Sequence, residues 1–300
     1  MGDARLASML TSSQVFFQPA TGRSGQRLYQ FHSAKPADAG RSPRGAVLYI
    51  HPFAEEMNKS RRMAAMQSRA LANAGFAVLQ VDLLGCGDSS GEFGDATWDD
   101  WVDDIVEAAD WLRQQCDAPV WLWGLRAGCL LATAAAARIQ YPCSFLFWQP
   151  ATTGRLVLQQ FLRLKAAAQL ADGGGKAILN RLKADLAAGI AVEVAGYSLH
   201  PQLASGLDAA LLVPPTLLAG TGIGEPRSLR RLVWLEVSTL ADANLSAPAT
   251  AVLARWIDSG FTVASSIVQG PMFWQTTEIE DAPALVAATV AQLLSEPVTA

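Results

Sequence analysis

The nine residues 120–128 constrain the fold of this chain more than any other stretch. Four apolar residues, Val-Trp-Leu-Trp, lead into Gly124, and an alanine-rich segment with almost no polar residue follows Gly128. Continuous apolar runs of this kind are typical of strands and helices that are buried on all sides. Glycines in a short turn allow a strand and a helix to approach closely. We therefore predict a buried strand, a sharp turn and a buried helix.

The turn between these two elements has the spacing of Gly-x-Ser-x-Gly, a motif whose central serine projects from the turn as a nucleophile. In this chain the central residue is Arg126. A guanidinium keeps its proton at physiological pH and cannot attack a carbonyl, so the frame is present without its usual nucleophile. The stretch thus indicates a fold more clearly than a reaction.

Composition excludes several classes of protein. The 300 residues are enough for one α/β domain with an insertion, and 51% hydrophobic with 17% charged residues indicates a globular chain. A net charge of -4 gives no reason to expect nucleic acid or an anionic membrane as a partner. Residues 1–18 include charged side chains where a signal peptide would be apolar, and no apolar run reaches membrane-spanning length. We expect a cytoplasmic protein with no membrane span.

The four cysteines are spaced for neither a metal site nor a disulfide framework. They lie 30, 13 and 14 residues apart, without a Cys-x-x-Cys pair or a nearby histidine: Cys86, Cys116, Cys129 and Cys143. Buried or half-buried free thiols are the simplest interpretation. We expect no metal and no cofactor.

The remaining pattern alternates strands with helices, which indicates a mostly parallel sheet. Two short antiparallel strands, 15–17 and 26–32, precede the apolar strand 46–50, a helix at 61–74 and the strand 76–81. Thr97 can cap the helix before the 120–128 stretch. Later strands are expected at 144–148, 231–237 and 261–268, and a final helix at 282–294. The expected fold class is α/β, with helices on both faces of the sheet.

A helical insertion interrupts this alternation after the strand 144–148. Residues 156–170 and 178–186 have helical spacing, and Pro201 can begin a third helix. We expect a core formed by residues 1–153 and 214–300, and a helical cap at 154–213. Because such sheets bind ligands beyond the carboxyl ends of their parallel strands, the cap would cover the binding crevice.

Three motifs give the chain a family resemblance. They are His-Pro-Phe at 51–53, Asp-Leu-Leu-Gly-Cys-Gly-Asp-Ser at 82–89 and the 124–128 turn, and together they resemble the α/β-hydrolase superfamily. The longer run at 51–62, Gly-Leu-Arg-Ala-Gly at the turn, Gln-Pro at 149–150, Gln-Phe-Leu-Arg-Leu at 160–164 and Phe273-Trp274 resemble the group called exosortase A system-associated hydrolase 2. That resemblance covers most of the chain. It implies an α/β-hydrolase-type fold and a bacterial role linked to exopolysaccharide production and protein sorting.

The superfamily pattern also implies an acid after a late strand and a histidine after the last one. Asp242 stands where the acid is expected, but the loop after the last strand has Phe273 and Trp274 in place of a histidine. The three histidines of the chain, His32, His51 and His200, all lie far from that loop in sequence. Because a triad works as a unit, losing both serine and histidine leaves little beyond binding and oxyanion donors.

The candidate catalytic residues are Arg126, Glu55, Glu56 and Asp242. Arg126, beside a helix N-terminus, could hold an anionic ligand, or it could pair with Glu55 or Glu56 and fill an unused pocket. We expect an ion pair in either case, because a buried charge needs a partner. The two glutamates could carry protons if burial raised a pKa, although a structural ion pair is the simpler interpretation.

The candidate ligand-binding residues surround the same crevice, and most of them also have a structural interpretation. His51 could act as a base, but support of the loop that follows its strand is more common at this position. Cys86 and Cys129 are weak candidates for a replacement nucleophile, and Ser89 and Ser90 are expected to be turn residues. Of the nine tryptophans, Trp148 and Trp274 fall near the crevice and could stack on a sugar. The complete ligand-binding set is His51, Phe53, Ala127, Gln149, Phe273 and Trp274.

Three hypotheses for function remain open at this point. The first is a hydrolase-like protein without a serine triad, whose capped pocket holds an anionic, acyl or sugar group at Arg126 and whose proton carriers are carboxylates. The second is a non-catalytic relative that binds a ligand or a protein partner. The third is an ordinary esterase with a displaced nucleophile. A homodimer is compatible with all three.

Overall fold

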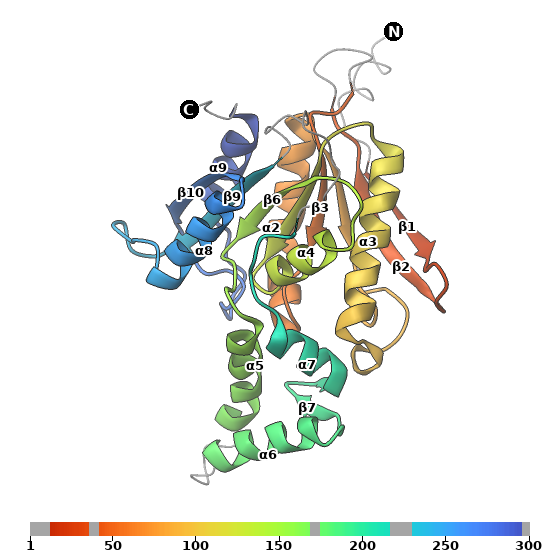
Figure 1. Ribbon diagram of the computed structural model, residues 1–300, viewed down its shortest axis with the longest axis vertical. Coiled ribbons are helices and arrows are strands. Elements are labelled where there is room, and N and C mark those ends of the chain that lie inside the picture. The colour runs from red at the N-terminus through yellow and green to blue at the C-terminus, as the bar shows by residue number, and fades with distance from the viewer. Residues whose placement is uncertain (1–12, 36–41, 169–174, 217–229, 296–300) are drawn as a thin grey trace.

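The computed structural model describes residues 13–35, 42–168, 175–216 and 230–295. Its centre is an eight-stranded sheet with the strand order β1-β2-β4-β3-β5-β6-β9-β10 (Figure 1). The strands are β1 (Ser13–Pro19), β2 (Gln26–His32), β3 (Ala46–Ile50), β4 (Ala77–Val81), β5 (Val120–Leu125), β6 (Cys143–Trp148), β9 (Arg231–Ser238) and β10 (Thr262–Gln269). Two neighbouring pairs of this sheet, β1–β2 and β2–β4, are antiparallel. The six strands β4, β3, β5, β6, β9 and β10 run parallel to one another, as expected for the α/β class.

Helices cover both faces of this sheet (Figure 1). On one face lie α3 (Trp98–Gln115), α4 (Gly128–Ala136) and α8 (Ala247–Asp258), and on the other lie α2 (Glu55–Asn73) and α9 (Pro283–Leu294). The short 3-10 helix η1 (Phe93–Asp95) precedes α3, whose first turn is capped by the side chain of Thr97, as the sequence indicates. The strand side chains alternate between the two resulting cores. In β5, for example, Leu122 faces the α3 and α4 side, whereas Trp123 faces α2 and α9.

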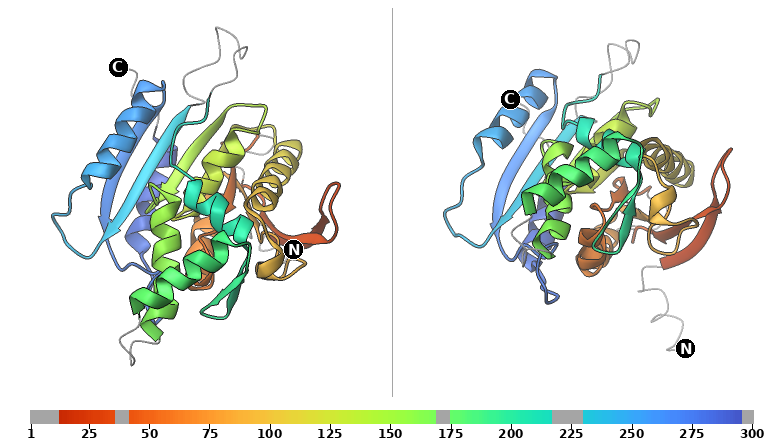
Figure 2. Two further views of the ribbon diagram at one scale, coloured as in Figure 1. Left: turned by 60° about the horizontal axis from the view of Figure 1, so that its bottom comes forward. Right: turned by 90° about the horizontal axis from the view of Figure 1, so that it is seen from below.

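The remaining elements form one continuous segment at the carboxyl end of the parallel strands. After β6 the chain enters α5 (Gly154–Ala168), α6 (Gly175–Ala187), the hairpin β7 (Val192–Val194) and β8 (Tyr197–Leu199), and α7 (Pro201–Ala209). Seen from below, these helices lie in front of the sheet (Figure 2). Thr153 and Leu211 form an isolated antiparallel bridge, so the segment leaves and rejoins the sheet at neighbouring points. We call residues 154–210 the α5–α7 segment.

The structure differs from the sequence prediction in three elements. Helix α2 begins at Glu55 rather than at residue 61, because Ala54 adopts a positive φ of 50° and turns the chain directly into the helix. The hairpin β7–β8 lies within the stretch expected to be wholly helical. Helix α8 was not expected; it is capped by Ser246 and begins with a proline in its first turn. Moving the start of α2 places Glu55 and Glu56 in the first turn of a helix.

Candidate functional site

The turn between β5 and α4 has the close-packed geometry that its glycines predict. A Cβ atom on Gly124 would lie 2.6 Å from the Cα of Cys129, and one on Gly128 would lie 2.3 Å from the carbonyl oxygen of Ile50. Neither position can therefore hold a side chain. Between them, Arg126 adopts a left-handed backbone with φ of 55°, which is strained for any residue but glycine. The fold keeps this strain and presents the Arg126 side chain at the carboxyl end of the sheet.

The Arg126 side chain is bound from two sides. Its Nε lies 3.3 Å from Oε1 of Glu56, and its Nη2 donates a 2.9 Å hydrogen bond to Oε1 of Gln160 on α5. Its guanidinium carbon also lies 5.9 Å from the ring centre of Trp274, within cation–π range. The side chain is only 13% exposed. The ion pair expected from the sequence is present, and it uses Glu56.

Glu55 and Glu56 occupy the first turn of α2, where carboxylates favour the positive end of the helix dipole. Burial raises the pKa of Glu56 to about 7, even though the neighbouring Arg126 opposes the change. Burial also raises the pKa of Glu55. One oxygen of each carboxyl group, Oε2, is buried and has no hydrogen-bond partner among the described residues. Glu56 can therefore hold or release a proton near neutral pH.

A cavity of about 360 Å³ lies beside Arg126, between α2, α5 and the loop after β10. We call it the α2–α5 cavity. Arg126 does not line it directly, but all three of its side-chain partners do. Its lining residues are Phe53, Glu55, Glu56, Lys59, Val157, Gln160, Phe161, Leu164, Trp274 and Gln275. Four of the residues expected from the sequence thus meet at one cavity: Phe53, Glu55, Glu56 and Trp274.

Several other candidates have structural roles instead of lining this cavity. His51 is buried, its Nδ1 donates to the carbonyl of Pro52 at 2.8 Å, and burial lowers its pKa. Gln149 joins two strands, since its Oε1 accepts from the backbone N–H of Val237 at 2.7 Å. Phe273 is buried against Trp148 and Trp274.

Asp242 and Trp148 also lie away from the α2–α5 cavity. Asp242 is in the turn after β9, as expected, but its side chain is exposed. Trp148 is fully buried and donates a 2.9 Å hydrogen bond from its indole to Thr289 of α9. It therefore belongs to the core and cannot form a platform for a ligand.

Two backbone N–H groups at the carboxyl ends of β3 and β5 have no partner among the described residues. One belongs to Phe53, in the loop after β3, and the other belongs to Ala127, directly after Arg126. In the Gly-x-Ser-x-Gly motif, the N–H groups at these two positions stabilise the negative oxygen of an acyl intermediate. Phe53 and Ala127 occupy the donor positions of that motif in sequence, and Arg126 occupies the position of its serine.

The thiols and turn serines show no nucleophilic arrangement. All four cysteines are free and buried, and burial raises the pKa of Cys129 well above its usual value. Ser89 donates to the carbonyl of Asp82 and accepts from the N–H of Leu28, so it ties the 82–91 loop to β2. The ring nitrogens of His32, His51 and His200 contact the side chain of Gln80, the carbonyl of Pro52 and the N–H of Gln202, respectively. Among the described residues, no group of His, Cys, Asp and Glu side chains is arranged to hold a metal ion.

The sequence reasoning missed the side of the cavity that α5 supplies. Val157, Gln160, Phe161 and Leu164 follow helical spacing and line the cavity from one face of α5. The Gln-Phe-Leu-Arg-Leu run was noticed only as part of the family resemblance. Its spacing indicated an amphipathic helix but gave no sign of which element that helix would face. The Nζ of Lys59 donates to the backbone carbonyl of Gln275 at 3.4 Å. Lys59 was missed because it precedes residue 61, where the sequence predicts the start of the helix that the structure begins at Glu55.

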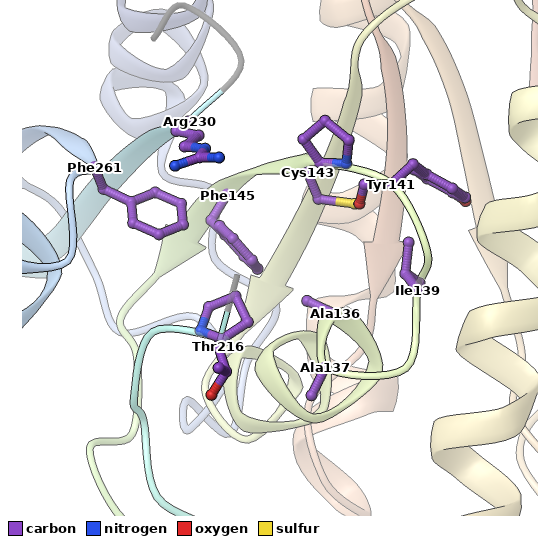
Figure 3. Close-up of a pocket in the computed structure, with 11 residues that line it drawn as sticks. Ala136, Ala137, Ile139, Tyr141, Cys143, Phe145, Thr216, Arg230 and Phe261 are labelled. Carbon is purple, nitrogen blue, oxygen red and sulfur yellow. The ribbon is translucent and has the colours of Figure 1, made fainter. Parts of the chain in front are cut away.

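A second cavity lies at the opposite end of the sheet (Figure 3). It is formed where α4 ends and β6 begins, between Ala136, Cys143 and Phe261. Its volume of about 40 Å³ is close to the share of liquid volume of a single water molecule, about 30 Å³. Of these two cavities, the α2–α5 cavity is therefore the better candidate for a ligand site.

Solved structures with a similar arrangement of strands and helices include esterases. The structure of Est1E from Butyrivibrio proteoclasticus with ferulic acid bound superposes with a TM-score of 0.59 at 15% identity, covering 95% of this chain and all of that one. This chain has the α/β-hydrolase fold. A thermostable carboxyl esterase from Bacillus coagulans in complex with glycerol matches similarly, with a TM-score of 0.58, 13% identity, and 95% and 98% coverage. Identities this low show the fold alone.

Two sequence comparisons match part of the chain. Residues 41–184 match the Hydrolase_4 family model, described as serine aminopeptidase, S33. Human Protein ABHD12B is 34% identical over 91 residues, which is 30% of this chain. The match spans 24% of the length of that relative. None of the helices in the described part of the chain has the length and hydropathy needed to span a membrane.

Proposed function

We propose that this α/β-hydrolase-fold protein binds a small molecule in the α2–α5 cavity and does not use a serine triad. In this proposal residues 1–153 and 214–300 are the core, and residues 154–213 are a cap that closes over the ligand. The ligand-binding residues are those that line the cavity, with Phe53, Glu55, Glu56 and Trp274 on the core side.

The observation that carries this proposal is the position of Arg126. The side chain that projects from the strand–helix turn is a cation, and it is bound to Glu56 of the core and to Gln160 of α5. A guanidinium in this position fills the space from which a serine would attack. The cavity beside it nevertheless remains large enough for a ligand, at the lower end of the usual range for small-molecule sites.

Hydrolysis carried by Glu56 is a second candidate function, which two observations favour. The pKa of Glu56 is raised to about 7, so its carboxylate could take a proton from a water molecule as that water attacks an ester carbonyl. The unpartnered N–H groups of Phe53 and Ala127 are placed in sequence where they would stabilise the resulting oxyanion. An acyl ester would give this water a carbonyl to attack, and the aromatic side chains of Phe53 and Phe161 would pack against its apolar part.

The biological setting is proposed from the resemblance to exosortase A system-associated hydrolase 2. That resemblance favours a bacterial protein linked to exopolysaccharide production and protein sorting, acting as a hydrolase or as a non-catalytic binding partner. Four free thiols fit a reducing compartment such as the cytoplasm. An anionic ligand at Arg126 and a homodimer belong to the same set of proposals, and nucleic acid is not among the expected partners.

Binding in the α2–α5 cavity can be tested with one matched pair of leucines on α5. Both leucines are exposed, but Leu164 lines the cavity, whereas Leu156, on the same helix, does not. We expect Leu164→Trp to abolish the thermal stabilisation given by cavity ligands in a small-molecule screen, and Leu156→Trp to preserve it. Equal responses of the two variants to every ligand would refute binding in this cavity.

Turnover of p-nitrophenyl esters separates a binding protein from a hydrolase. Hydrolysis that Glu56→Gln reduces about 100-fold or more would show the second candidate function, since general-base catalysis contributes about 10²–10⁴-fold. No turnover, together with ligand binding, would show a non-catalytic binding protein. Labelling by a fluorophosphonate probe would refute both proposals, because it would reveal an activated serine.

A further inference from the structure

The edge of the sheet at β1 is open in the described part of the chain. There β1 pairs only with β2, in an unbroken antiparallel register that runs from Ser13 opposite His32 to Pro19 opposite Gln26. Figure 1 shows this hairpin extending beyond α3, which packs on β3 and β4 nearer the middle of the sheet. The backbone groups of β1 that face away from β2 therefore lie on a free edge, and a free edge can pair with a further strand.

The sequence of β1 does not protect this edge. Proteins usually block a free edge strand with a charge, an inner proline or a bulge. β1 reads Ser-Gln-Val-Phe-Phe-Gln-Pro, so it has no charged residue, its proline comes last, and its register contains no bulge. Val15 is 61% and Phe17 is 48% exposed, whereas Phe16 between them packs on Trp111 of α3. The edge strand is thus apolar, uncharged and exposed.

The opposite edge of the sheet, at β10, is different. β10 also lacks charged residues, but its larger apolar side chains, Val263, Ile267 and Val268, are all half-buried. The helices α8 and α9 pack against this strand from the two faces of the sheet. Of the two edges, β1 is therefore the one that exposes large apolar side chains.

Alternate residues of β1 direct their backbone groups away from β2. Ala20 donates to the carbonyl of Gly25 at 3.1 Å across the hairpin turn. In an antiparallel pair the bonded residues alternate along each strand, so Gln18 and every second residue before it bond to β2. The N–H and C=O groups of the residues between them, including Val15 and Phe17, point outward. The outward backbone groups and the exposed apolar side chains therefore belong to the same residues.

We propose that β1 is the interface of a homodimer in which two copies of this chain join their sheets edge to edge. The two strands run antiparallel, with Phe16 opposite the partner's Phe16. In this register Val15 exchanges both of its backbone hydrogen bonds with the partner's Phe17, and the twofold axis repeats the pair. Gln14 lies opposite the partner's Gln18 on the other face of the sheet. Each apolar side chain thus meets an apolar one and each amide meets an amide, so the strand is complementary to itself.

This inference rests on the homodimer of the proposed function, to which it assigns a surface. It requires nothing of the α2–α5 cavity, because no residue of β1 lines that cavity. The interface and the ligand site can therefore be tested separately.

Sedimentation velocity over a range of protein concentrations measures the dimer and its Kd. We expect the unmodified protein to form a species of twice the mass of one chain. Phe17→Lys should raise the Kd at least about tenfold, or about 1.4 kcal/mol, because it replaces two apolar cross-strand pairs. Ser265→Lys is the matched control, since it places the same charge at an exposed position of the other edge strand, β10, and it should leave the Kd unchanged. Both positions are exposed, so circular dichroism should show both variants to be folded.

Cysteine cross-linking tests the register of the two strands. The variants Val15→Cys and Phe17→Cys are oxidised separately and as an equal mixture. In mixed dimers the new cysteines stand directly opposite each other, with Cα atoms about 5.5 Å apart, which a disulfide can bridge. In dimers of one variant alone they lie diagonally, about 7–8 Å apart, which is too far. Because the four native cysteines are buried, we expect covalent dimers to form at least about tenfold faster in the mixture.

The possible results distinguish this interface from the rest of the proposed function. A monomer at every concentration would overturn the β1 interface and the homodimer together. A dimer whose Kd is unchanged by Phe17→Lys would overturn the β1 interface and keep the homodimer, and weakening by Ser265→Lys would then place the contact at β10. Cross-linking that is equally fast in the mixture and in the separate variants would overturn the register. None of these results bears on ligand binding in the α2–α5 cavity, which Leu164→Trp tests.

Discussion

Replacing Glu56 with glutamine should change how the stability of this protein depends on pH. The pKa of Glu56 is raised from 4.5 to about 7 by burial, so the folded protein binds this proton more tightly than the unfolded chain does. The contribution of Glu56 to the free energy of unfolding is therefore fully present below pH 4.5. It decreases as the pH rises and is lost once the pH has passed about 7. At about 1.4 kcal/mol per pH unit, the full loss is about 3 kcal/mol. Glutamine has a similar shape and cannot lose the proton, so it should remove this loss.

Urea unfolding followed by tryptophan fluorescence measures the effect. The difference in free energy of unfolding between Glu56→Gln and the unmodified protein should grow in favour of the variant by about 2–3 kcal/mol between pH 5 and pH 8. Glu280→Gln is the control, because Glu280 is exposed in the loop before α9. Its difference from the unmodified protein should stay constant within about 0.5 kcal/mol.

A difference that does not change with pH would refute this reasoning. It would mean that Arg126, at 3.3 Å, stabilises the ionised carboxylate enough to cancel the effect of burial. Glu56 would then be ionised throughout the neutral range with an ordinary carboxylate pKa, and it would be a weaker base than the second candidate function requires.

Two further changes test the structure that supports the site. Gly128→Ala should lower the free energy of unfolding by more than about 3 kcal/mol, because its methyl group would overlap the backbone carbonyls of Ile50 and His51. Gly270→Ala is the matched control, since its methyl group meets no atom closer than 3.3 Å, and its cost in urea unfolding should stay below about 1 kcal/mol. Asp104→Asn should cost about 3–5 kcal/mol, because the fully buried Asp104 is ion-paired with Arg27 at 2.7 Å and with Arg23 at 2.8 Å. A cost below about 1 kcal/mol would show that this pair adds nothing beyond an exposed salt bridge.

The strand and helix pattern of the core could be predicted because each element carries its own signal. The strands 46–50 and 26–32 were predicted with their observed bounds, since continuous apolar or alternating residues between turns admit few other interpretations. The start of α2 was wrong because Ala54, an ordinary residue, takes up a positive φ that its identity does not reveal. The β7–β8 hairpin was missed because three-residue strands carry too short a pattern to be recognised.

The amino-acid sequence by itself determined that a strand, a tight turn and a helix meet at Arg126, and that a charge there would need a partner. It did so through local physics: the glycines 124 and 128 permit close packing, and a buried guanidinium is costly alone. Only the tertiary structure decided that this partner is Glu56, that Gln160 of α5 accepts a hydrogen bond from Arg126, and that the ring of Trp274 lies within cation–π range of it. These contacts link positions 34, 70 and 148 residues from Arg126. Which residues meet across such separations depends on how helices pack on the sheet, and no local pattern encodes it.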